Sequence, residues 1–413
     1  MDLLEWFVFL STLIGALNTG SFLTLDVATK TLQNKWGFDS DEMVSVGTVG
    51  YSLGFLGVAL SSLYLNKFGP KVFIILGGSL TSLCWLGIYL TLCKGCIEWH
   101  YAMLFEAGIG CGTALSYLSS ASIITKSSFG DGRKMKLIFL ALFVAIGSII
   151  AFIIFVDLNN VKLTILIMLI YNSVSTILLF ISSFIYKEEQ VISLPLYGQQ
   201  LEEQKNFSAS FGMYLFALNL TFGVVMTFIN SANGILDSFE KKWDNPNNKS
   251  QFPLICFVIG NFIGRFSGIF LRSYLKYMLH LFSGFSIILA ILQSILLINW
   301  NIRIVFAMLG ISAIFFGIIW AITMPMAREF FNIREDRSLG LVFFGMALLP
   351  MVFGMLASWL YRYRKSYLGD TCDYTCFWTY LSLSTMATIL SVFSYICAWY
   401  LRRNEKFMRL EIL

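Results

Sequence analysis

The feature that most constrains the fold of this chain is a series of long apolar segments that recurs along the whole sequence. We count twelve of them, and most reach about 20 residues, the length an α-helix needs to cross the hydrocarbon core of a bilayer. Their approximate boundaries are residues 6–25, 43–65, 72–93, 99–125, 137–156, 163–186, 208–235, 251–271, 278–299, 302–325, 338–361 and 377–401. The pattern predicts an all-α polytopic membrane protein with twelve transmembrane helices.

Composition agrees with this prediction and excludes several other classes of protein. The 413 residues are 57% hydrophobic and 13% charged, whereas soluble domains average roughly 45–50% apolar and 25% charged residues. These fractions exclude a soluble enzyme, a disordered scaffold and a small disulfide-rich module. The net charge of +5 is not gathered into a basic tail or domain, so we expect the lipid bilayer and a small solute as partners, and no nucleic acid. We expect a monomer.

The connections between the segments divide the chain into two similar halves. The longest polar connection separates the sixth segment from the seventh. We therefore predict an N-terminal six-helix bundle at 1–186, a cytosolic central linker at 187–207, a C-terminal six-helix bundle at 208–401 and a cytosolic tail at 402–413. Two bundles related by pseudo-symmetry are typical of secondary transporters.

The basic residues of the connections predict the orientation. Twelve crossings place both termini on one side of the membrane. Of the 29 Lys and Arg residues, 17 lie in connections on that side, 11 lie on the opposite side, and Arg265 lies within a span. Because positively charged connections stay in the cytosol, both termini are expected there. A plasma membrane and an internal organelle membrane fit this pattern equally well.

Two cysteine pairs fall on the outer side in this orientation. Cys372 and Cys376 belong to the last outer loop, and Cys93 and Cys96 to the loop between the third and fourth segments. Each pair either forms a local disulfide or remains as free thiols, since spacing alone fixes no connectivity. Asn248 opens an N-x-S sequon in another outer loop, where it is a candidate for glycosylation.

Two charged residues stand well inside predicted spans, where a charge costs roughly 2.5–3.5 kcal/mol on insertion scales. Glu106 lies in the outer half of the fourth span, and Arg265 lies in the eighth. Glu106 is either a proton-coupling carboxylate or a polar group that faces water or a neighbouring helix. Arg265 is either an anchor for the carboxylate of a substrate or an architectural residue that snorkels or caps helix-end carbonyls.

The residues around Arg265 indicate how its helix is used. Gly260, Gly264 and Gly268 recur every four residues and predict a flat face for close helix packing. Asn261 and Arg265, also four residues apart, share a second face roughly 100° away. One face is therefore expected to pack against a neighbouring helix, while the next presents an amide and a cation to a substrate.

Polar residues in the first and seventh spans add candidates for substrate binding. Asn18 lies in the first span, and Asn230 and Asn233 lie late in the seventh, just before Gly234. The seventh-span cluster either unwinds the helix locally and exposes hydrogen-bonding groups to a substrate, or makes amide bonds between helices.

Two prolines predict irregular helices. Pro325 lies at the end of the tenth span and Pro350 lies inside the eleventh, and a proline inside a helix is a common cause of a kink.

No motif for catalysis, metal binding or a cofactor is found in the sequence. The two histidines, His100 and His280, lie near the ends of spans and belong to no recognisable metal or catalytic motif. No phosphate-binding loop is visible, which argues against a pump driven by ATP. We therefore expect no enzyme and no cofactor, and keep an integral-membrane enzyme only as an alternative.

Several stretches of the chain are similar to one family in their order and spacing. Between the second and third spans lies Leu65-Asn-Lys-Phe-Gly-Pro-Lys71. The others are Phe228 to Ile235, Phe316 to Ile322 followed by Ala327 to Phe331, and Cys372 to Phe377. Together they resemble the major facilitator superfamily, and within it the nodulin-like branch near the monocarboxylate porters.

The resemblance implies a fold, a mechanism and roles for particular residues. It implies two six-helix bundles that bind a solute near the bilayer midplane and expose it alternately to the two sides. Asn66 stands where the superfamily loop has an Asp, beside the matching Lys67 and Gly69, which implies a weaker lock between the halves. In monocarboxylate porters an Asp of the eighth span precedes an Arg by four residues. Asn261 and Arg265 hold these positions, which implies anion binding without that proton-coupling acid.

A second resemblance, to the large-neutral-amino-acid facilitators, rests on Asp41-Glu-Met43 and on the Phe-Gly-Pro loop. Both resemblances lead to the same class of function. We expect a secondary transporter for a small organic anion such as a monocarboxylate, or for an amino acid, with or without a coupled proton or cation. A facilitator-fold receptor or scaffold that no longer transports remains an alternative, because Asn66 and Asn261 depart from the family pattern.

Overall fold

The computed structural model describes most of the chain as helices joined by turns. The described residues are 3–27, 37–38, 42, 46–47, 50–94, 98–127, 130–157, 161–185, 208–240, 252–331, 335–368 and 375–410. Residues of the predicted central linker and the sequon at Asn248 lie outside these ranges. The predicted all-α class is confirmed, because every regular element within the described ranges is a helix.

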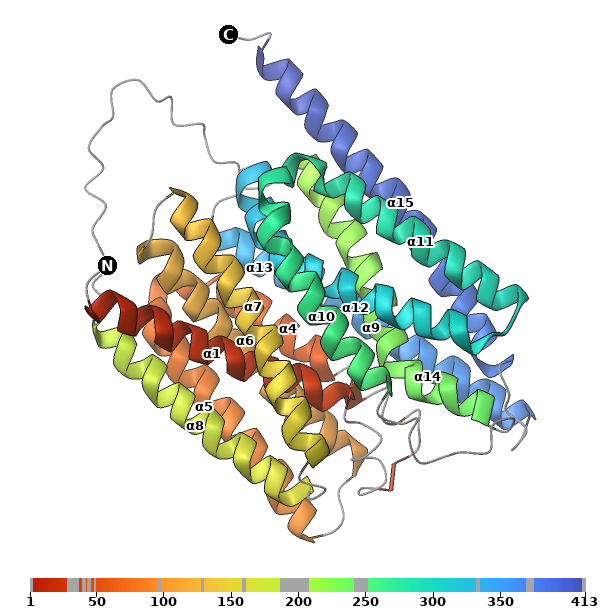
Figure 1. Ribbon diagram of the computed structural model, residues 1–413, viewed down its shortest axis with the longest axis horizontal. Helices are drawn as coiled ribbons and strands as arrows, with labels where there is room; N and C mark the ends of the chain where they lie inside the picture. The colour runs from red at the N-terminus through yellow and green to blue at the C-terminus, as the bar shows by residue number, and fades with distance from the viewer. Residues whose placement is uncertain are drawn as a thin grey trace.

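Helices of the first half of the chain gather into one bundle, shown from red to yellow in Figure 1. Its members are α1 (Leu3–Val27), α4 (Gly50–Ser62), α5 (Leu65–Lys94), α6 (Trp99–Ser127), α7 (Gly130–Asp157) and α8 (Val161–Ile185).

Helices of the second half gather beside the first bundle, shown from green to blue in Figure 1. They are α9 (Ala209–Glu240), α10 (Phe252–Leu271), η2 (Arg272–Tyr277), α11 (Met278–Ile298), α12 (Ile302–Pro325), η3 (Met326–Phe330), α13 (Glu335–Gly345), α14 (Leu348–Leu368) and α15 (Thr375–Leu410). Counting α13 and α14 as one crossing, the described helices supply the twelve predicted spans. Nine helices in the described part of the chain are long and apolar enough by themselves to cross a membrane.

Side-chain hydrogen bonds join the third and sixth spans of each bundle, which are α5 and α8 in the first bundle and α11 and α15 in the second. In the first bundle, Asn172 of α8 donates to Ser82 of α5 over 2.9 Å. In the second, Gln293 of α11 donates to Ser384 of α15 over 3.0 Å and accepts from Thr388 over 3.1 Å. Such bonds hold membrane helices together where the hydrophobic effect gives little preference, and their repetition supports the pseudo-symmetry of the halves.

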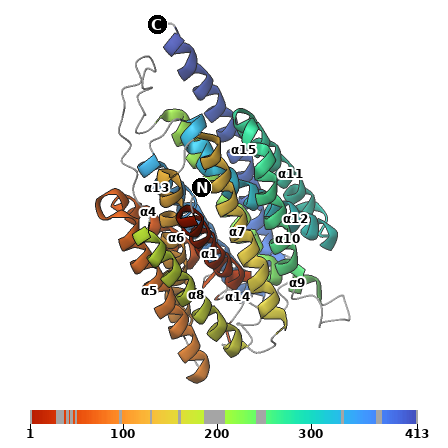
Figure 2. The same cartoon turned by 60° about the vertical axis from the view of Figure 1, so that its left-hand side comes forward.

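The most extensive contacts between the two bundles, in the described part of the chain, are made by two pairs of helices. α7 packs against α10, and α4 packs against α13. Figure 2 shows the second contact from another side, with α13 lying beside α4. The first pair carries the hydrogen bond between Arg265 and Ala141, and the second carries Phe55 and Phe343.

The eleventh span is a broken helix. α13 ends at Gly345 and α14 begins at Leu348. Pro350 explains the break, because its ring clashes with the carbonyl four residues earlier, at Met346, and its nitrogen has no hydrogen to donate. The break is supported by α9, where the side-chain oxygen of Asn219 accepts from the backbone N–H of Leu349 at 3.1 Å. The single apolar segment predicted from the sequence therefore forms two helices.

The ends of α12 and α15 also differ from the span boundaries predicted from the sequence. Pro325 is the last residue of α12, and a π-helical turn follows it. α15 continues as a helix to Leu410, through most of the predicted tail. Its last turns are held by Glu405, which accepts from the hydroxyl of Ser210 at 3.1 Å and pairs with Arg402 at 3.3 Å.

The seventh span stays helical where the sequence allowed it to unwind. α9 runs unbroken past Asn230 to Glu240. Phe228, Ala232 and Ile235 are buried in one hydrophobic cluster along this stretch, so unwinding would leave backbone N–H and C=O groups unpaired in apolar surroundings. Of the two interpretations offered by the sequence, local unwinding is therefore wrong.

Candidate functional site

Arg265 lies in the interior of the protein and contacts three helices. Its side chain has no exposed surface. Nε donates to the side-chain oxygen of Asn261 at 2.8 Å, which confirms that these two residues share a face of α10. Nη1 donates to the backbone oxygen of Ala141 in α7, also at 2.8 Å. The guanidinium carbon lies 5.1 Å from the ring centroid of Trp320 in α12, which is cation–π distance.

The glycine face of α10 explains how the helix reaches this position. A Cβ on Gly264 would overlap the backbone oxygen of Ile314 and lie 2.9 Å from the Cα of Gly317, both in α12. Similar Cβ positions on Gly260 and Gly268 would come within 2.5 and 2.6 Å of alanine side chains of α12. The predicted close-packing face is therefore confirmed. With that face against α12, the neighbouring face carries Asn261 and Arg265 to α7.

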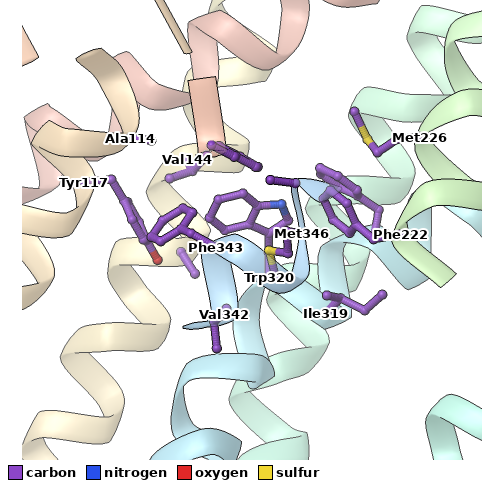
Figure 3. Packing of buried hydrophobic residues seen from close by; sticks show 14 of the residues in the cluster. Ala114, Tyr117, Val144, Phe222, Met226, Ile319, Trp320, Val342, Phe343 and Met346 are labelled. Carbon is purple, nitrogen blue, oxygen red and sulfur yellow. The ribbon is translucent and has the colours of Figure 1, made fainter. Parts of the chain in front are cut away.

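Four aromatic side chains join the two bundles around Trp320, and we call them the interface cluster: Phe55 of α4, Tyr117 of α6, Trp320 of α12 and Phe343 of α13. Ring centroids of Phe55 and Tyr117 each lie 5.7 Å from that of Trp320. Phe343 lies 6.1 Å from Trp320 and 5.3 Å from Phe55. All four contacts are edge-to-face, the geometry that aromatic pairs favour. Figure 3 shows Tyr117, Phe343 and Trp320 side by side.

Two buried donors, one within this cluster and one beside Arg265, have no hydrogen-bond acceptor among the described residues. They are Nδ2 of Asn261 and Nε1 of Trp320. In Figure 3 the indole nitrogen faces the side of the cluster where Phe222 lies. A buried N–H without an acceptor costs roughly 1–3 kcal/mol. The surroundings of Arg265 therefore hold a cation and spare donor capacity, which suits a ligand with negative charge and several acceptor atoms.

Asn18 makes its hydrogen bond inside the first bundle. Its side chain is buried and donates to the side-chain oxygen of Asn172 in α8. Asn172 in turn donates to Ser82 of α5. The amide of Asn18 therefore belongs to a chain of hydrogen bonds inside the first bundle.

Glu106 is buried, with 5% of its surface exposed, and packs against Gly50 of α4, whose Cβ position lies 3.1 Å from the Cβ of Glu106. It precedes Tyr117 by eleven residues on α6, which corresponds to about 16 Å along a helix. The structure thus places the candidate coupling acid toward the Trp99 end of α6, well away from the level of Trp320.

The loop that matched the superfamily motif lies at the start of α5. Gly69 has a φ of 74°, where a residue without a Cβ is favoured, and Pro70 follows it. Lys67 is exposed, with its amine 5.6 Å from the ring of Phe68. The side chain of Asn66 lies outside the described residues.

Several predicted residues are described in part or not at all. The side chain of Asn233 is outside the described residues, and so are Cys96, Cys372 and the side chain of Cys376. Cys93 is exposed and carries a free thiol. The structure therefore leaves the Cys372–Cys376 pair as a prediction.

Sequence reasoning did not single out the interface cluster or Ala141. In a chain with 16% aromatic residues, a tryptophan within an apolar span carries no signal of its own. Ala141 contributes only its backbone oxygen. The one available signal was Phe316 to Ile322, the stretch containing Trp320, which was noted for its resemblance and not for its chemistry.

Comparison with known proteins identifies the fold. No family model matches the chain, and no curated protein matches its sequence. A bacterial homolog of the human lysosomal transporter Spinster, inward-facing and unoccupied, has a TM-score of 0.61 at 14% identity, covering 98% of both chains. Its occupied form has a TM-score of 0.59 at the same identity and coverage.

The proton:xylose symporter XylE, described as a member of the major facilitator superfamily and bound to 6-bromo-6-deoxy-D-glucose, has a TM-score of 0.63 at 12% identity. The match covers 93% of this chain and 94% of that one. The fold is that of the major facilitator superfamily. The predicted twelve-helix facilitator fold is thereby confirmed. In this fold the hydrogen bond from Arg265 to Ala141 joins the two bundles.

Proposed function

We propose that this protein is a secondary membrane transporter that moves a small organic anion, such as a monocarboxylate, or an amino acid by alternating access. The observation that carries the proposal is the buried guanidinium of Arg265, which lies between the two bundles of a facilitator fold. Charged residues inside membrane spans are costly, and they mark solute pathways more often than architecture.

The chemistry of the site supports a carboxylate as the bound group. A guanidinium presents several N–H groups in one plane and binds a carboxylate through two parallel hydrogen bonds. Asn261 Nδ2 and Trp320 Nε1 add buried donors that have no acceptor in the described part of the chain. A monocarboxylate or the carboxylate of an amino acid supplies the missing acceptors, whereas a cation would be repelled.

Asn261 and Arg265 on α10 also bear on whether transport is coupled to a proton. An amide at position 261 cannot take up and release a proton, so Arg265 and Asn261 hold the anion without proton exchange between them. Transport coupled to a proton or cation would use another group, and the buried Glu106 is the candidate in the described residues.

A binding measurement tests the anchor role. Lactate, pyruvate, leucine and the neutral lactamide are added to purified protein, and the shift of the unfolding temperature is recorded. We expect stabilisation by at least one carboxylate and none by lactamide, with the stabilisation lost in Arg265→Ala. The control is Arg303→Ala, which removes an exposed arginine at the start of α12. If Arg265→Ala responds to the carboxylate as wild type does, the anchor role is wrong.

A facilitator-fold receptor or scaffold would give the same binding result, and an integral-membrane enzyme would give chemical turnover. The transporter is distinguished from both by net movement of the unchanged solute across a sealed membrane.

A further inference from the structure

Several contacts between the two bundles lie toward one side of the membrane. We call it the linker side, because α4 and α10 end there and α9 begins there. On that side Ser62 of α4 lies against α13, with its Cβ 3.0 Å from the Cβ position of Gly340. The bond of Arg265 to Ala141 and the contacts of Trp320 with the first bundle lie about 8–17 Å from the linker-side ends of their helices, at 1.5 Å per residue.

We propose that Arg265 is the latch of a linker-side gate, held by the backbone oxygen of Ala141 and positioned by Trp320, and that a bound anion opens the gate by competing for the same guanidinium. The gate itself rests on contacts that the structure contains. The competing anion rests on the proposed function.

Competition follows from the hydrogen bonds of the guanidinium. Nε is directed to Asn261 and Nη1 to the Ala141 oxygen. Two parallel hydrogen bonds from a guanidinium to a carboxylate use Nη2 together with either Nη1 or Nε. A carboxylate bound through Nη1 and Nη2 approaches the nitrogen that donates to the Ala141 oxygen, and so competes with that oxygen. Hydrogen bonds between two charged groups are roughly twice as strong as neutral ones. A carboxylate bound through Nη1 and Nη2 therefore displaces the peptide oxygen of Ala141, and the bond that ties α10 to α7 is released.

Trp320 is the positioning residue of the latch. One face of its ring lies under the guanidinium, while Phe55 and Tyr117 of the first bundle contact it edge-to-face. The indole thus connects Arg265 to α4 and α6, while Arg265 itself bonds to α7. When the bundles separate on this side, the aromatic contacts and the Ala141 bond must break together.

Cross-linking across the gate tests the proposal. Ser62→Cys and Gly340→Cys are combined in the full chain, and a protease site is inserted in the connection at 187–207. After oxidation and cleavage, the halves remain together on a non-reducing gel only where the two new cysteines are joined. Chains carrying either substitution alone correct for the native thiols. We expect rapid cross-linking in the otherwise wild-type background.

The rate of cross-linking is then compared in variants of the two latch residues, Arg265 and Trp320. Arg265→Ala is expected to lower the ratio of closed to open gate about tenfold, the factor for loss of one hydrogen bond to a charged group, and so to slow cross-linking. Trp320→Leu is expected to slow it as well, and Trp320→Phe, which keeps an aromatic face under the guanidinium, to restore much of the rate. The matched control is Trp85→Leu, which removes an equally buried tryptophan from α5 of the first bundle.

The outcomes separate the latch from the proposed substrate. Slower cross-linking in Arg265→Ala and Trp320→Leu, with Trp85→Leu unchanged, supports the latch. Wild-type rates in both latch variants overturn it, even if Arg265 binds anions. An anion that binds wild-type protein without slowing its cross-linking overturns the competition. If no anion binds but the variants still loosen the gate, the proposed substrate class fails and the latch stands.

Discussion

Replacing Gly264 by alanine is the sharpest test of how the site is built. The glycine faces α12 at backbone distance, so the added methyl would overlap the oxygen of Ile314 and lie 2.9 Å from the Cα of Gly317. Neither atom belongs to a flexible side chain. Ordinary contacts between carbon atoms are about 3.5–4.0 Å, so α10 and α12 must move apart by about 1 Å.

The cost can be estimated against a control on the partner helix. Overpacking of this kind typically costs about 1–3 kcal/mol. Gly310 of α12 and Gly284 of α11 have no atom within 4 Å of their Cβ positions. Alanine at either site should stabilise the protein by about 0.5–1 kcal/mol, because glycine is the poorer helix former. Because both variants gain the same helix propensity, Gly264→Ala is expected to be less stable than Gly310→Ala by the overpacking cost, roughly 1–3 kcal/mol.

The assay is unfolding of purified protein in one detergent, by heat or by titration with a denaturing detergent. Gly264→Ala should unfold first, wild type next, and Gly310→Ala and Gly284→Ala last. Equal stability of Gly264→Ala and Gly310→Ala would refute the close packing of α10 on α12. The account of how Arg265 reaches α7 would then fail with it.

Three further substitutions test other parts of the account. Asn219→Leu removes the acceptor of the Leu349 N–H at the helix break and should lower the free energy of unfolding by about 1–3 kcal/mol; an unchanged unfolding midpoint would contradict the role of this bond. Asn172→Ala removes the hydrogen bond between the side chains of Asn18 and Asn172 and should lower thermal stability without changing which solutes bind. A changed solute profile would return Asn18 to the binding site. Asn261→Asp places a carboxylate beside the guanidinium, so anion uptake should fall more steeply with rising pH than in wild type, and parallel pH profiles would contradict the proposed role of the amide.

The membrane architecture was predictable because its cause is visible in the sequence. A bilayer requires about 20 apolar residues for each crossing, and the segments at 278–299 and 302–325 nearly coincide with α11 and α12. The spacing of Gly260, Gly264 and Gly268 by four residues was also enough to predict the packing face of α10, because residues four apart lie on the same side of a helix.

The remaining features depend on tertiary contacts that leave no local pattern. Pro350 indicated an irregular eleventh span, but the capping of the break by Asn219 depends on how α9 packs. The acceptor of Arg265 in α7 is a backbone oxygen, and any residue at position 141 would offer one. Trp320 acts through ring contacts with two helices of the other bundle, and one aromatic residue among many in the sequence gives no indication of them.

Uptake of a labelled anion into sealed proteoliposomes tests the central claim most directly. Wild-type protein and Arg265→Ala are reconstituted at equal density, and the entry of labelled lactate, pyruvate and neutral amino acids is followed, with exchange against unlabelled solute inside. The account predicts saturable uptake of at least one carboxylate by wild type, and its loss in Arg265→Ala but not in Arg303→Ala. Uptake by Arg265→Ala at the wild-type rate, or binding by wild type with no movement of any of these solutes, would contradict it.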